Sequence, residues 1–208
     1  MTSTPSAAAA RVDRTPLTLA AALLSLAGVA AIWLPFAWST SPAEALFDGD
    51  LWYLAAPFLL AVPIAAAWIW TLLERSLQPG AQWAARVLAG CAMAPTALFY
   101  AEAVREANFS SSSLGEWLWL LGPLALAVGW VALMIRWRPG GRAIGAGEAI
   151  ALMEAAFLPN AFLCLVAFTD QRQIGWYVSI AVSAGFAAHV VATARRAARR
   201  VGPRAQVS

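Results

Sequence analysis

Six apolar runs divide this chain, and they constrain its fold more than any other feature. They extend over residues 17–38, 51–73, 83–104, 117–135, 144–168 and 174–194. A helix of about 20 apolar residues is long enough to cross the roughly 30 Å hydrocarbon core of a bilayer. Backbone amides in lipid must be paired within their own segment, so each run is expected to be helical. The sequence therefore predicts an all-α, polytopic membrane protein, a bundle of six transmembrane helices.

The composition agrees with this class. Charged residues make up only 12% of the chain and hydrophobic residues 61%, whereas a soluble globular domain has about 25% charged residues. A chain so poor in charge is not expected to cover a water-facing surface. Prolines inside the runs do not oppose helices, because membrane helices tolerate proline as a kink. These prolines are Pro35, Pro57, Pro63, Pro95, Pro123 and Pro159.

The arginines are distributed unevenly between the connections. Twelve of the fourteen lie in the N-terminal tail, the second and fourth connections and the C-terminal tail, and only Arg105 and Arg172 lie in the others. Basic residues concentrate in cytoplasmic loops. We therefore expect a multi-pass protein of a bacterial inner (plasma) membrane, with both termini in the cytoplasm. Because topology accounts for the basic charge, we expect no nucleic-acid partner.

The chain is expected to divide into a cytoplasmic N-terminal tail (residues 1–16), a six-helix transmembrane domain (17–194) and a basic cytoplasmic C-terminal tail (195–208). A secretory signal peptide is the competing interpretation of the first run, because Arg11 and Arg14 precede it. The hydrophobic core of a signal peptide is usually only about 7–15 residues long. The first run is longer, and we favour a retained helix.

Glu154 is the most informative single residue, because it lies about ten residues into the fifth run and so near the expected midplane. Insertion of a charged side chain there costs roughly 2.5–3.5 kcal/mol. Glu154 is either an ion or proton site, or a protonated side chain hydrogen-bonded to a neighbouring helix. Pro159 frees the carbonyl of Ala155 and is expected to open the backbone nearby. Asn160 is a further candidate, although it lies about 240° around the helix from Glu154.

Glu148 and His189 form a second candidate site. Each lies a few residues from the expected inner end of its helix, and sequential helices are usually neighbours. We therefore expect the two side chains to touch, either as a proton relay or as a static hydrogen bond.

The end of the sixth run is strongly basic. Arg195, Arg196, Arg199 and Arg200 occupy one side of a helix that should continue past the bilayer, and Gly202-Pro203 should end it. Anionic lipids attract such residues by roughly 1 kcal/mol each. We expect this face to contact anionic lipid headgroups, or else only to fix topology during insertion.

The function that follows is a non-enzymatic membrane subunit or accessory protein that packs against other membrane proteins or a second copy of itself. The alternatives are a small ion- or proton-linked transporter with Glu154 at the midplane, and an intramembrane enzyme acting on lipid. No nucleophile–base set, phosphate loop or metal-ligand spacing is visible, since His189 is the only histidine. We expect no cofactor and no metal. Cys91 and Cys164 should differ in depth and remain unbridged.

Overall fold

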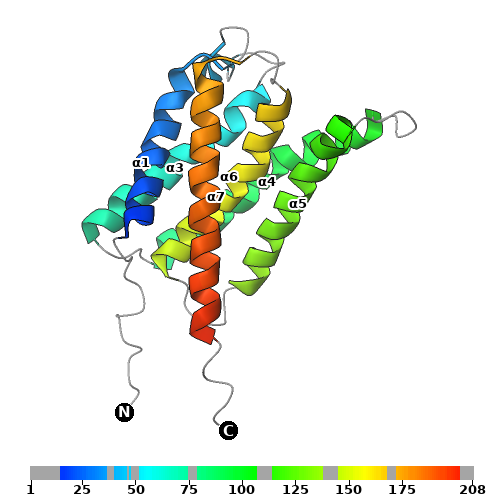
Figure 1. Cartoon of the computed structure of the whole chain (residues 1–208). Coiled ribbons are helices and arrows are strands. Elements are labelled where there is room, and N and C mark those ends of the chain that lie inside the picture. Colours follow the sequence, from blue (N-terminus) through cyan, green and yellow to red (C-terminus); the bar gives the residue numbers. More distant parts are fainter. Residues whose placement is uncertain are drawn as a thin grey trace, which may run out of the picture.

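The computed structural model describes residues 15–36, 40–45, 47, 52–74, 79–106, 114–137, 145–167 and 172–201, and every secondary-structure element within these ranges is a helix (Figure 1). The elements are α1 (Pro16–Ala30), the 3-10 turn η2 (Ala31–Trp33), α2 (Pro42–Ala45), α3 (Trp52–Glu74), α4 (Pro79–Glu106), α5 (Leu114–Arg136), α6 (Ala146–Ala167) and α7 (Ile174–Val201). The all-α prediction is thus confirmed for the described part of the chain.

Each of the six apolar runs coincides with a long helix, but the end of the first helix differs from expectation. The first helix stops at Trp33 instead of residue 38, because Leu34 has an extended backbone (φ −86°, ψ 141°). A residue that precedes proline avoids the helical region, so Pro35 ends this helix and does not kink it. The short helix α2 follows in the first connection, where the sequence predicted none.

The last helix continues beyond its apolar part, as expected. α7 extends to Val201, immediately before Gly202. Arg195 and Arg199 are exposed on it, and the guanidinium Nε of Arg196 donates to the carbonyl of Ala192 at 3.4 Å. The side chain of Arg200, the fourth residue of the predicted basic face, lies outside what the structure describes.

α6 is the central helix of the bundle. It packs against α3, α4, α5 and α7, whereas α1 packs on the far side of α3 and α7 (Figure 1). Of the residues in the α6 segment Ala146–Val166, 78% are buried inside the bundle, compared with 33% of those in the α7 segment Ile174–Arg199. A polar residue on α6 therefore meets other helices on most sides.

Three of the described helices are long and apolar enough to cross a membrane, namely Pro16–Trp33, Ala146–Val166 and Ile174–Arg199. α3 and α5 contribute shorter apolar stretches, Leu59–Leu73 and Leu121–Arg136. The first residues of α1 and the last residues of α7 lie at the same end of the bundle, the lower end in Figure 1.

Close approach between helices depends on small residues, and two glycines illustrate this. A Cβ on Gly28 of α1 would lie 3.3 Å from the Cβ of Ala61 on α3. A Cβ on Gly175 would lie 2.8 Å from the carbonyl oxygen of Pro35, to which the Gly175 amide donates a hydrogen bond. Glycine at these positions lets α1 approach α3 and the start of α7 meet the segment after η2.

Candidate functional site

The interior of the bundle contains a hydrogen-bonded pair of titratable side chains, Glu154 of α6 and His189 of α7. The distance from His189 Nδ1 to Glu154 Oε2 is 2.5 Å. Glu154 is completely buried, and His189 is 1% exposed. Glu154 is the ninth residue of the 22 in α6, so the pair lies well away from either end of the central helix.

Two further side chains complete the network around this pair. The indole Nε1 of Trp68, on α3, donates to Glu154 Oε1 at 3.0 Å. The hydroxyl of Thr193, one turn after His189 on α7, lies 3.3 Å from His189 Nε2. Every oxygen of the carboxyl group and every nitrogen of the imidazole therefore has a partner. The network of Trp68, Glu154, His189 and Thr193 joins α3, α6 and α7.

Trp68 also fixes where a proton can reside. An indole N–H is a donor only, so Glu154 Oε1 must accept from it. Any proton on the carboxyl group then lies on Oε2, facing His189 Nδ1. The contact fits a carboxylate that accepts from Nδ1–H and equally a carboxylic acid that donates to Nδ1. A net charge on the pair would be buried, which is costly unless hydrogen bonds offset it.

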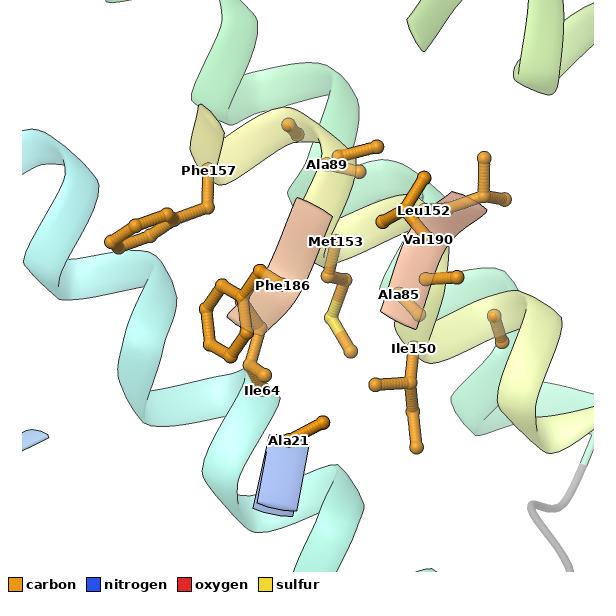
Figure 2. Close-up of a cluster of buried hydrophobic side chains, with 14 of the residues drawn as sticks. Ala21, Ile64, Ala85, Ala89, Ile150, Leu152, Met153, Phe157, Phe186 and Val190 are labelled. Atoms are coloured by element: carbon orange, nitrogen blue, oxygen red, sulfur yellow. The ribbon is translucent and has the colours of Figure 1, made fainter. Parts of the chain in front are cut away.

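Apolar and aromatic side chains enclose the network. The ring of Trp68 meets the imidazole of His189 edge to face, with centroids 5.0 Å apart. One turn further along the two helices, Phe157 and Phe186 form a second edge-to-face pair with centroids 5.2 Å apart. Figure 2 shows these two phenylalanines with Met153 and Ile64 in the surrounding apolar cluster. The pair thus lies in a dry environment, where hydrogen bonds are strong and unpaired polar groups are expensive.

Glu148 does not take the expected place beside His189, and that prediction is wrong. Both ring nitrogens of His189 bond elsewhere, whereas Glu148 Oε2 accepts from the amide of Gly145 at 2.9 Å. Glu148 thereby caps the first turn of α6. The register explains the error: Glu154 lies opposite His189 and Phe157 opposite Phe186, so in these antiparallel helices Glu148 is level with Arg195.

Asn160 serves a different helix contact. Its Nδ2 donates to the carbonyl of Ala92 on α4 at 2.9 Å and to the carbonyl of Ala156 at 3.0 Å. Asn160 and Glu154 therefore face different neighbours, as their spacing around the helix predicts. The opening of the backbone expected at Pro159 is not found, because α6 continues without interruption from Ala146 to Ala167.

The sequence missed two members of the network. Trp68 is one of 11 tryptophans, and this number favours an interfacial explanation for each of them. The hydroxyl of Thr193 is weakly polar by itself. One usable signal was the i, i+4 spacing of His189 and Thr193, which places both on one face of a helix.

The other sequence predictions about chemistry concern metals and cysteines. Among the residues that the structure describes, no group of three or more histidine, cysteine, aspartate or glutamate side chains is arranged to hold a metal ion. Cys91 is exposed and Cys164 is buried, and neither forms a disulfide, as their expected depths indicated. Comparison with known proteins identifies no relative: no family model, no curated protein and no solved structure matches this chain.

Proposed function

We propose that this chain is a non-enzymatic integral membrane protein, a subunit or accessory protein, in which the Glu154–His189 pair is a fixed connection between helices. The observation that carries the proposal is the complete internal pairing of the network. Each polar atom of Glu154 and His189 already has a partner from the chain itself, which leaves none of them oriented toward a substrate. A polar group that is fully paired in a dry core specifies the register of the helices that it joins.

The membrane location belongs to the same proposal. Six long helices coincide with the six apolar runs, and we propose that all six span a bacterial inner membrane. The distribution of arginine supports a cytoplasmic location for both termini. The arginines at the end of α7 then lie at the cytoplasmic headgroups, where anionic lipids attract them. Other membrane proteins, or a second copy of this chain, are the partners that such a subunit would contact.

Proton-linked transport is the second candidate, and one observation favours it. Glu154 and His189 are two titratable groups in direct contact, so a proton can pass between them within the bundle. Thr193 extends the polar chain one turn along α7 toward its basic end. Transport would require the enclosed network to open to water, first on one side of the membrane and then on the other.

Reconstitution distinguishes the two candidates. The purified chain is inserted into liposomes that contain a pH-sensitive dye, and a pH gradient is imposed across the membrane. A fixed connection predicts that proteoliposomes with the wild-type chain and with Glu154→Gln dissipate the gradient at the rate of protein-free liposomes. Faster dissipation by the wild-type chain that Glu154→Gln abolishes would establish the transport candidate instead.

A further inference from the structure

A second polar cluster lies where α4, the end of α5 and the start of α6 meet, at the lower end of the bundle in Figure 1. Arg86 of α4 donates from Nη2 to the carbonyl of Trp137 at 3.0 Å. Trp137 follows directly after the last residue of α5 and is only 5% exposed. This corner is separate from the Glu154–His189 pair, and the two share no hydrogen bond in the described chain.

Two buried donors of this corner have no acceptor. The guanidinium Nε of Arg86 and the indole Nε1 of Trp137 are both buried, and neither has a hydrogen-bond partner. Among the residues that the structure describes, no carboxylate forms an ion pair with Arg86. A buried donor without an acceptor destabilises a protein, and more so when the group is charged. Such groups are rare in native structures, and an acceptor on another molecule is one way to satisfy them.

We propose that Arg86 and Trp137 bind a phosphate group. A suitable partner accepts hydrogen bonds from a guanidinium and an indole and carries negative charge, because no carboxylate in the described part of the chain pairs with Arg86. Phosphate oxygens meet both requirements, and the planar guanidinium matches their geometry. The side chain of Arg86 is partly exposed, so the phosphate enters from that side and turns the guanidinium toward itself.

A third donor indicates a phospholipid as the source of the phosphate. The indole Nε1 of Trp130 is also buried without a partner. Trp130 lies seven residues before Trp137, on the same face of α5 and about 10 Å further from this end of the helix. A glycerophospholipid carries ester carbonyls deeper in the bilayer than its phosphate, so one lipid can serve both positions. Free phosphate would reach Arg86 and Trp137 but not Trp130.

The test compares three probes on the full chain in detergent micelles: phosphatidylglycerol, diacylglycerol and inorganic phosphate. Binding is followed by the shift of the thermal unfolding midpoint with probe concentration. The variants Arg86→Gln, Trp137→Phe and Trp130→Phe each remove one donor. The matched controls are Arg136→Gln and Trp83→Phe, at exposed positions of α5 and α4. Arg86→Lys keeps the positive charge but lacks the planar guanidinium group. This variant is used in place of Arg86→Gln if Arg86→Gln does not fold.

We expect phosphatidylglycerol to bind the wild-type chain and diacylglycerol to bind much more weakly. Arg86→Gln should weaken phosphatidylglycerol binding by at least about tenfold, because a charge-assisted contact is lost, and the controls should leave it unchanged. Binding of inorganic phosphate that Trp137→Phe weakens and Trp130→Phe does not would support the phosphate site with a soluble source. Equal phosphatidylglycerol and phosphate binding by Arg86→Gln and Arg136→Gln would overturn the proposal. These binding measurements do not involve Glu154 or His189, so they test the phosphate site independently of the proposed function.

Discussion

Replacing Glu154 by alanine and, separately, by glutamine separates the packing role of this residue from its charge. Alanine leaves the indole N–H of Trp68 and the Nδ1 of His189 without their partner. Each buried polar group left unpaired costs about 1–3 kcal/mol. The loss of side-chain volume adds to this, since neither side of the network is open to solvent. We therefore expect Glu154→Ala to lower the free energy of unfolding by about 2–5 kcal/mol.

Glutamine can satisfy the same network without a charge. Its carbonyl oxygen accepts from Trp68, its amide donates to His189 Nδ1, and His189 Nε2 then donates to the hydroxyl of Thr193. This arrangement keeps a partner for Trp68, His189 and Thr193 and leaves only the second amide N–H of glutamine without one, so Glu154→Gln should cost clearly less than Glu154→Ala. Hydrogen bonds between membrane helices average only about 0.6 kcal/mol, which sets the scale of the remaining difference.

The assay is equilibrium unfolding in mixed micelles, followed by far-ultraviolet circular dichroism during titration with sodium dodecyl sulfate. Leu152→Ala is the matched control, because Leu152 is fully buried on the same helix and has an apolar side chain. In a Trp68→Phe background, Glu154→Ala should become milder by about 1 kcal/mol because one fewer donor is orphaned, whereas Leu152→Ala should not change. Equal destabilisation by Glu154→Ala and Glu154→Gln would refute this reasoning.

Three further predictions concern other parts of the molecule. Gly175→Ala should destabilise the chain, because its Cβ would collide with the carbonyl of Pro35, whereas Gly129→Ala on α5 meets open space and should be neutral or slightly stabilising; thermal unfolding of both variants checks this. The pKa of Glu44 is held below its ordinary value of 4.5 by hydrogen bonds from the backbone N–H and the hydroxyl of Ser41. Ser41→Ala should raise that pKa in a carboxyl NMR titration. Because the folded-state pKa is lowered, the stabilisation of α2 by this contact is present above pH 4.5 and is lost as the pH falls through the lowered pKa. An unchanged titration curve would contradict this assignment. For topology, a C-terminal reporter should be cytoplasmic, and a periplasmic signal there would refute an even number of spans. Reporters inserted at Asp48, Ser111 and Gln171 should be periplasmic, and reporters at Gln78 and Gly140 should be cytoplasmic. All five positions lie outside the residues that the structure describes.

The sequence predicted the helices well because apolar runs of bilayer length have few alternatives. The residues at which the helices end were harder to predict from the sequence. Leu34 adopts an extended backbone because a residue that precedes proline avoids the helical region. The apolar run continues past Leu34, so the hydrophobic pattern alone does not show this helix end. α7 extends to Val201, the last residue that the structure describes, and Gly202 and Pro203 after it are strong helix terminators.

The buried pair was only half predicted. Glu154 and His189 were both identified as unusual, but Glu148 was assigned as the partner of His189. That assignment estimated depth by counting from residues 144 and 194, the inner ends of the two apolar runs, whereas Glu154 lies opposite His189. The relative depth of two residues on neighbouring helices depends on how the side chains of the helices interdigitate. Here the contact of Phe157 with Phe186 is part of that packing. A single sequence does not contain that register.

The most direct test of the central claim is whether the Glu154–His189 pair exchanges protons with water. Infrared spectroscopy of the chain in lipid bilayers, with Glu154→Gln as the reference, isolates the carboxyl signal of Glu154. The pH is varied across the ordinary values of glutamate and histidine, about 4.3 and about 6.5. A fixed, enclosed connection predicts a Glu154 signal that stays constant across this range. A Glu154 signal that appears and disappears with the pH of the surrounding water would contradict the account and identify the pair as a proton-binding site.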